Sequence, residues 1–127
     1  MNARRGAILI SCLAAACCIF ASSPIQEAPE AVATKKNPLE GQPSAELAGR
    51  KLFQRECASC HGSDAQGTAW APPLRQREVR SASPGALFWV LRNGSLRRGM
   101  PSFAHLPEPQ RWQIVTYLKS LPHNPGR

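Results

Sequence analysis

The pentapeptide Cys57-Ala58-Ser59-Cys60-His61 constrains the fold of this chain more than any other part of its sequence. On a helix, residues at positions i, i+3 and i+4 share one face, so both thiols and the imidazole would point the same way. If this segment is helical, the three side chains can therefore contact one common neighbour.

This spacing is typical of a covalent haem attachment site. Cys57 and Cys60 would bond the two vinyl groups at a haem edge, while the imidazole of His61 would reach the iron. A thioredoxin-like redox pair would need a βαβ context, which the sequence does not show. A zinc site would need further ligands, and only His105 and His123 remain. Because the sequence contains no internal repeat, we predict one covalently bound haem c per chain.

Met100 is the predicted second ligand of the iron. Iron with histidine on one face needs a ligand on the other face, or it stays open to small molecules. Met100 is the only methionine besides the initiator, and it lies in a predicted loop between Gly99 and Pro101. Glycine lets the backbone approach a haem closely, and proline fixes the chain beyond it. The alternatives are a gap-filling core role for this methionine and ligation by His105 from the same loop.

The N-terminus has the pattern of an export signal. Arg4 and Arg5 precede an uncharged apolar run over residues 6–21, whose 16 residues are fewer than the ~20 that span a bilayer. Residues 1–21 are therefore predicted to be a cleaved signal, with a retained membrane anchor or a lipid anchor at Cys12 as alternatives. We expect a periplasmic or otherwise exported protein, with attachment to a membrane as the alternative.

The remaining chain divides into three parts by composition. Residues 22–43 are rich in Pro, Ala, Glu and Lys without periodicity, which predicts a disordered tether. Residues 44–122 form the predicted folded domain, and residues 123–127 are a tail. Cleavage of the signal would leave Cys57 and Cys60 as the only cysteines, so no disulfide framework is expected.

Apolar spacing predicts three helices in the folded part and no strand of useful length. The first covers about residues 45–59, with Ser44 as a possible cap. The second begins at Ser83-Pro84 and ends at Asn93-Gly94. The third begins near residues 107–109 and is stopped by Pro122. We therefore predict an all-α fold.

Five segments of the folded part carry motifs in a fixed order: Gly49–Phe53, Cys57–His61, Ala71–Leu74, Gly99–Phe103 and Arg111–Leu118. Together they resemble a class I cytochrome c of the bacterial exported type, over about residues 45–121. The resemblance implies three to four helices wrapped around one covalently attached haem, and electron transfer without enzymatic activity. It also implies that Gly49 and Phe53 of the first helix cross the last helix near Tyr117.

The resemblance assigns roles to two further residues. The carbonyl of Pro72 would accept a hydrogen bond from the second ring nitrogen of His61, which fixes the ring and raises its basicity. Leu74 would pack on the haem. The family often has glycine where Ala71 stands, and its partners for the haem propionates have no clear match. Candidates for those partners are Trp70, Trp89 and Arg92.

Charge suggests the kind of partner. The chain carries a net charge of +8, and the stretch 75–98 holds six arginines against Glu78 alone. Such a surface suits respiratory-type redox proteins with acidic docking faces or an anionic membrane, whereas no recognition-module pattern indicates nucleic acid. Two alternatives to a mobile electron carrier are a peroxidase-like or gas-sensing haem with a labile Met100, and a fixed cytochrome subunit of an oxidase or a quinoprotein dehydrogenase.

Overall fold

A computed structural model describes residues 22–122 of the chain. The predicted export signal at residues 1–21 lies outside the described residues, as does the tail at residues 123–127 with His123. None of the helices within the described part is both long enough and apolar enough to cross a membrane.

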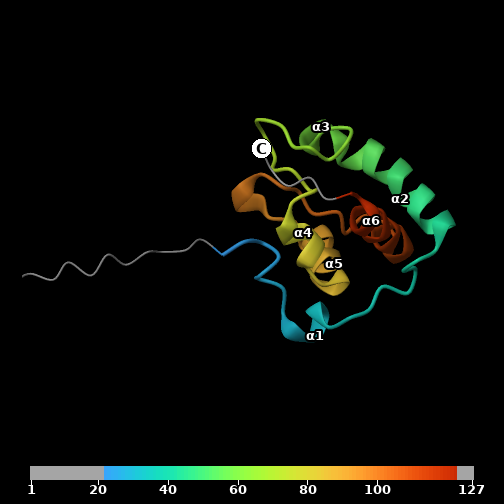
Figure 1. The fold of residues 1–127 in the computed structure, drawn as a ribbon. Helices are drawn as coiled ribbons and strands as arrows, with labels where there is room; N and C mark the ends of the chain where they lie inside the picture. Colours follow the sequence, from blue (N-terminus) through green and yellow to red (C-terminus); the bar gives the residue numbers. More distant parts are fainter. Residues whose placement is uncertain (1–21, 123–127) are drawn as a thin grey trace, which may run out of the picture.

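The described part of the chain is helical, which confirms the predicted all-α fold class (Figure 1). Its only β-type pairing is an isolated bridge between Ser95 and Met100. The elements are α1 (Glu30–Ala33), α2 (Pro43–Glu56), α3 (Ala58–His61), α4 (Arg77–Ser81), α5 (Pro84–Asn93), the 3-10 helix η1 (Leu96–Arg98) and α6 (Glu108–Ser120).

Helix α5 begins and ends where its local signals predict. The hydroxyl of Ser83 accepts a hydrogen bond from the backbone N–H of Ala86 at 3.2 Å, and Pro84 occupies the first helical position. Gly94 follows the last residue of the helix. Helix α6 likewise ends at Ser120, shortly before Pro122. The bounds of both helices therefore agree with those that their local sequence signals predict.

The first predicted helix, 45–59, is divided in the structure. Helix α2 starts at Pro43 with Gln42 as its cap, so Ser44 lies inside the helix. The helix ends at Glu56, and Cys57 joins it to the single turn of α3. Between the first and second predicted helices, where no helix was predicted, lies the short helix α4, whose one buried residue is Val79.

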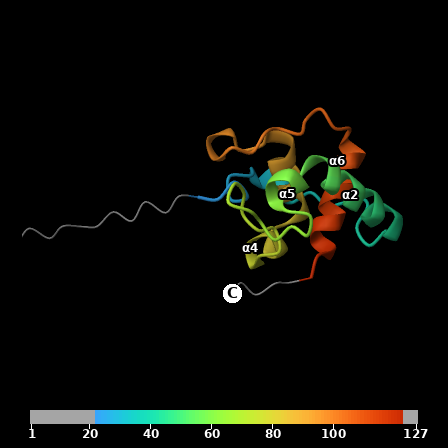
Figure 2. The same cartoon turned by 90° about the horizontal axis from the view of Figure 1, so that it is seen from above.

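Helices α2 and α6 cross in close contact (Figures 1 and 2). A Cβ atom added to Gly49 would lie 1.9 Å from the backbone oxygen of Gln113, so only glycine fits at the crossing. One turn further along α2, the ring of Phe53 lies 5.3 Å from the ring of Tyr117. The crossing implied by the resemblance is therefore present.

The segment 22–43 differs from its prediction as a disordered tether, because it packs against the domain. Helix α1 lies on α5, where a Cβ atom at Gly85 would come within 2.0 Å of the backbone oxygen of Val32. Asn37 is buried and donates a hydrogen bond to the hydroxyl of Thr116 at 2.8 Å. These contacts join residues far apart in sequence, so local composition did not reveal them.

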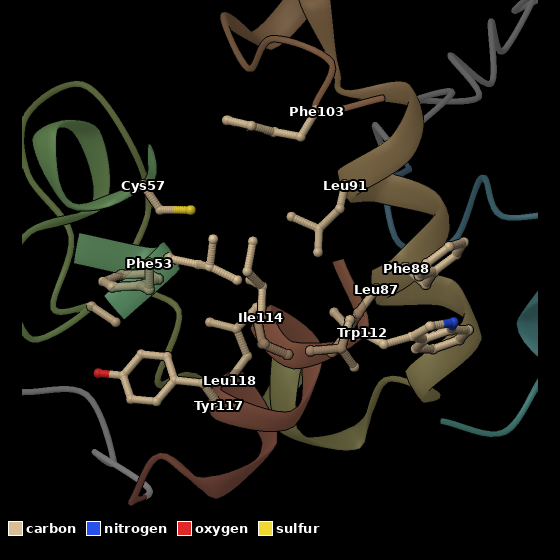
Figure 3. Close-up of a cluster of buried hydrophobic side chains, with 14 of the residues drawn as sticks. Phe53, Cys57, Leu87, Phe88, Leu91, Phe103, Trp112, Ile114, Tyr117 and Leu118 are labelled. Atoms are coloured by element: carbon tan, nitrogen blue, oxygen red, sulfur yellow. The ribbon is translucent and has the colours of Figure 1, made fainter. Parts of the chain in front are cut away.

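The hydrophobic core gathers between α2, α5 and α6 (Figure 3). Phe53, Ile114 and Val115 are its fully buried large side chains. At its far side, Phe88 of α5 stacks on Trp112 of α6 with ring centroids 4.0 Å apart. Several core side chains, among them Phe53, Leu91 and Ile114, also line a cavity.

Candidate functional site

A cavity of about 380 Å³ lies against the core, and its walls come from segments along most of the described chain. Figure 3 shows Cys57, Leu91 and Phe103 around part of this space. Its apolar wall comes from α2, α5 and α6 and includes Phe53, Leu87, Val90, Leu91, Ile114 and Leu118.

The cysteine–histidine motif forms one side of the cavity, where Cys57, Cys60 and His61 all line it. The backbone N–H of Cys60 and that of His61 both bond to the carbonyl of Cys57, at 3.2 and 2.9 Å. This single tight turn brings the motif's side chains to one face, as the spacing predicts. Cys57 is buried and Cys60 is exposed, so the motif reaches from the core to the surface.

The surroundings of the Cys57 thiol do not suit a redox-active thiolate. Burial above all, and then the charges of Glu56 and Cys60, raise the pKa of the Cys57 thiol to about 12. Redox-active cysteines have lowered pKa values, because the thiolate is the reactive form. Within residues 22–122, no group of three or more His, Cys, Asp and Glu side chains could hold a metal ion. Neither alternative to haem attachment therefore gains support.

His61 is oriented by the loop that follows it. Its ring nitrogen Nδ1 lies 2.8 Å from the carbonyl oxygen of Pro72, which can only accept, so Nδ1 carries the proton. This contact, implied by the resemblance, is present. The loop is held in place because Thr68 donates to the carbonyl of Cys60 at 2.6 Å, and the N–H of Leu74 bonds to Ala65 at 2.8 Å. Nε2 of His61 is then left as the ring nitrogen free to bind a metal.

Met100 lies on the wall of the same cavity, although it is distant from His61 in sequence. Its loop is closed by two backbone hydrogen bonds between Met100 and Ser95, at 2.8 and 3.1 Å. The rival ligand, His105, is exposed and does not line the cavity. The structure thus brings Met100, and not His105, to the cavity that His61 lines.

The other residues expected to contact the haem or its propionates do not all lie at the cavity. Leu74 and Trp70 line the cavity, whereas Trp89 and Arg92 do not. Among the six arginines of the stretch 75–98, Arg98 alone lines it.

Sequence analysis missed one part of the site. Ser23, Pro24 and Ile25 also line the cavity, and they belong to the segment predicted to be a tether. The only available signal was Ile25, an isolated apolar residue in a polar, proline-rich stretch. One such residue has no periodicity, and periodicity is what sequence patterns detect.

Comparison with known proteins points to one family. Residues 44–118 match the family described as cytochrome C oxidase, cbb3-type, subunit III. The chain is similar to the crystal structure of cytochrome cL from the marine methylotrophic bacterium Methylophaga aminisulfidivorans MPT. That similarity has 27% identity and a TM-score of 0.62, over 76% of this chain and 68% of the other. Among curated proteins, no sequence matches the chain closely.

A second solved structure supports the fold alone. The c-type cytochrome XoxG from Methylobacterium extorquens AM1 matches with 23% identity and a TM-score of 0.53. The match covers 60% of this chain and 49% of that one, so this chain spans about half the length of XoxG.

The donor set of the cavity fits a covalently attached haem. Two cysteines, an imidazole with one nitrogen already bonded to Pro72, and a thioether line one apolar space. Thioether and imidazole are the axial ligands of one class of haem iron, and thiols on one helical turn suit attachment at a haem edge. A buried thiol that stays protonated at neutral pH is also compatible with an atom that ends in a thioether bond.

Proposed function

The chain belongs to the mono-haem cytochrome c family and carries covalently bound haem c, and from that premise we propose that it passes single electrons between respiratory-type redox proteins. Members of this family transfer electrons and are not enzymes. The observation that carries the proposal is the cavity that gathers His61, Met100 and both motif cysteines. When bound, the haem iron supplies a one-electron Fe(II)/Fe(III) couple.

Each residue has a separate role in this proposal. Cys57 and Cys60 would hold the haem covalently, and His61, whose orientation is set by Pro72, would ligate the iron. Met100 would be the second iron ligand and would keep oxygen and peroxide away from the iron. The apolar wall, to which Leu74 contributes, excludes water and favours the less charged reduced state.

Replacement of Met100 by alanine tests this assignment. Methionine ligation gives an oxidised haem a weak charge-transfer band in the far red. Met100→Ala is expected to abolish this band and to let carbon monoxide bind rapidly to the reduced protein. The reduction potential should fall by on the order of 0.1 V, since axial ligands set haem potentials over ~0.8 V. Optical spectra and a potentiometric titration measure both effects.

The matched control is His105→Ala, which removes the rival ligand from the same loop. This variant should keep the band and the potential of the unmodified protein, because His105 lies away from the cavity. A normal potential in Met100→Ala, or a lost band in His105→Ala, would contradict the assignment of Met100. Rapid carbon monoxide binding by the unmodified protein would instead favour gas sensing or peroxidase-like chemistry.

A second candidate is a cytochrome domain fixed in a larger oxidase. The match to a family described as an oxidase subunit favours it. Purification from the native membranes under mild conditions distinguishes the two. A mobile carrier elutes alone, whereas a fixed subunit remains with haem-containing oxidase chains after a salt wash.

The partner and the location follow from charge and from the N-terminus. A net charge of +8 favours a partner with an acidic docking face, which speeds encounter. Export to the periplasm, with a possible membrane tether or lipid anchor, rests on residues 1–21. These lie outside the described part, so export remains our expectation from the sequence.

A further inference from the structure

Residues 22–27 precede the segment that matches the family, yet three of them line the haem cavity. The family match covers residues 44–118, whereas Ser23, Pro24 and Ile25 are part of the cavity wall. Ile25 packs against the hydrophobic core, and the hydroxyl of Ser23 is buried without a hydrogen-bond partner. We call residues 22–27 the strap.

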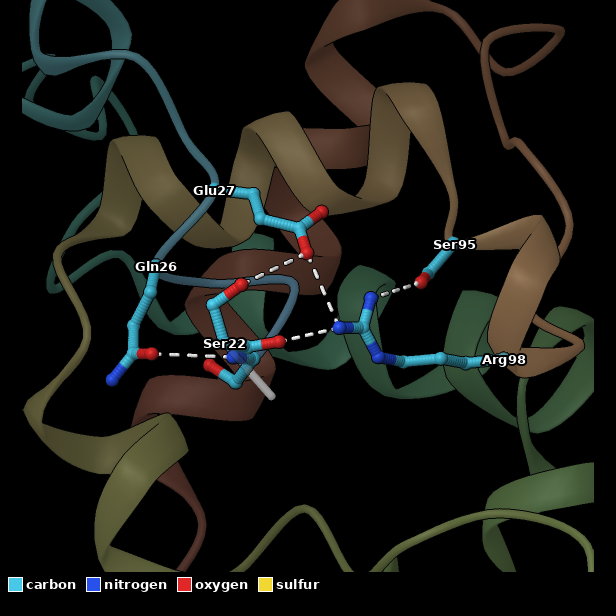
Figure 4. A network of polar contacts seen from close by, with 6 residues as sticks. Ser22, Gln26, Glu27, Ser95 and Arg98 are labelled. Atoms are coloured by element: carbon cyan, nitrogen blue, oxygen red, sulfur yellow. Dashed lines mark hydrogen bonds and ion pairs between the residues drawn. The ribbon is translucent and has the colours of Figure 1, made fainter. Parts of the chain in front are cut away.

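Arg98 connects this strap to the Met100 loop (Figure 4). Its Nη2 atom donates to the carbonyl of Ser22 and to the carboxylate of Glu27, the latter at 3.2 Å. Its Nη1 atom donates to the hydroxyl of Ser95 at 3.1 Å. One guanidinium therefore holds both ends of the strap and the first residue of the Met100 loop, a planar fork geometry that lysine cannot supply.

The same loop positions the proposed iron ligand. Ser95 and Met100 exchange two backbone hydrogen bonds, at 2.8 and 3.1 Å, and Arg98 itself lines the cavity. If the loop moved so that Met100 left the cavity, the hydrogen bonds from Arg98 to Ser22 and Glu27 would break, or the strap would move with the loop. The strap and the loop are thus mechanically coupled through Arg98.

We propose that the strap closes the haem cavity beside Met100, and that Arg98 is the positioning residue that holds the strap and the Met100 loop together. This inference rests on the proposed function, since it takes Met100 as the iron ligand. While Arg98 keeps its hydrogen bonds to the strap, Met100 leaves the iron rarely and water stays out of the cavity. Without it, Met100 still ligates the iron but dissociates more often.

The rate at which cyanide binds to the oxidised holoprotein tests this role of Arg98, because Met100 must leave the iron before cyanide can bind. In Arg98→Ala, cyanide should bind about threefold to tenfold faster, as expected for loss of exposed charge-assisted hydrogen bonds. The far-red band should persist in this variant. In Glu27→Gln, which keeps the bond from Arg98 to Ser22, the rate should rise less.

Arg97→Ala is the matched control. Arg97 is an exposed arginine on the same 3-10 helix, so its removal changes the net charge equally. This variant should bind cyanide at the rate of the unmodified protein. Equal rates in Arg98→Ala, Arg97→Ala and the unmodified protein would overturn the inference and leave Met100 ligation standing. Equal acceleration in both variants would also overturn it, because charge alone would then explain the effect.

Amide hydrogen exchange in the holoprotein provides a readout that does not depend on the iron ligand. Residues 22–27 and 95–100 should exchange faster in Arg98→Ala than in Arg97→Ala. If the far-red band is missing from the unmodified protein, the proposed function fails, and exchange still decides whether Arg98 holds the strap. Identical exchange in the two variants would show that it does not.

Discussion

Asn37 is the residue that fixes the N-terminal segment to the last helix. Its side chain is buried, and its amide donates to the hydroxyl of Thr116 at 2.8 Å. Its side-chain oxygen accepts from the backbone N–H of Leu39 at 2.9 Å. A buried amide with both ends satisfied fixes the position of the chain around it.

We expect Asn37→Ala to destabilise the holoprotein by ~2 kcal/mol, because the hydroxyl of Thr116 loses a buried partner. Asn93→Ala is the control, since Asn93 is exposed and donates only to Trp89 on its own helix. Its effect should stay below ~1 kcal/mol. Urea unfolding followed by circular dichroism measures both. Equal losses in the two variants would mean that Asn37 does not hold the segment.

The hydrogen bond of His61 could be predicted from the sequence, whereas that of Asn37 could not. The bond from His61 to Pro72 could be expected, because both residues lie in motifs of the family that the chain resembles. The bond from Asn37 to Thr116 crosses most of the chain, and no motif surrounds Asn37. Contacts of that kind depend on the tertiary fold, so sequence analysis placed Asn37 in a tether.

The crossing of α2 and α6 supports the wall that carries Phe53 and Ile114. It is close because Gly49 has no side chain, and a Cβ atom there would lie 1.9 Å from a backbone oxygen. Backbone cannot move aside as a flexible side chain can, so the helices would have to separate. Such a separation would also move the cavity wall.

Gly49→Ala should therefore destabilise the holoprotein by ~2–4 kcal/mol, although alanine favours an isolated helix by up to ~1 kcal/mol. The melting temperature should fall by roughly 10 °C or more. Lys51→Ala, on an exposed position of the same helix, should change it little. Thermal unfolding followed by far-ultraviolet circular dichroism compares the two variants. A melting temperature unchanged in Gly49→Ala would mean that the crossing is looser than described.

Helices with strong local signals were predictable, and short ones were not. Helix α5 has a capping serine, a proline at its first position and regular apolar spacing. Helix α4 has five residues and one buried side chain, and α1 has four residues and none. Elements this short are stabilised by packing on the rest of the domain, and propensity alone does not predict them.

At the scale of the whole molecule, the cavity is large for so short a domain. Its volume of about 380 Å³ lies directly against the core, between the motif and the Met100 loop. Its wall is mostly apolar, so without the haem these side chains would lie against water instead of a packed partner. We therefore expect the haem to contribute to the stability of the domain.

Loss of both attachment cysteines should accordingly remove the cooperative fold. Protein carrying Cys57→Ser and Cys60→Ser, with loosely bound haem extracted, is expected to show reduced helix content and no sharp thermal transition. The control is Ser59→Ala, which changes the same turn at an exposed position and should keep covalent haem and a cooperative melt. Calorimetry and circular dichroism compare the two. A haem-free chain that melts as sharply as the holoprotein would show that the helices close over the cavity without the haem. The chain would then fold before it binds haem, and the haem would not be needed for the stability of the domain.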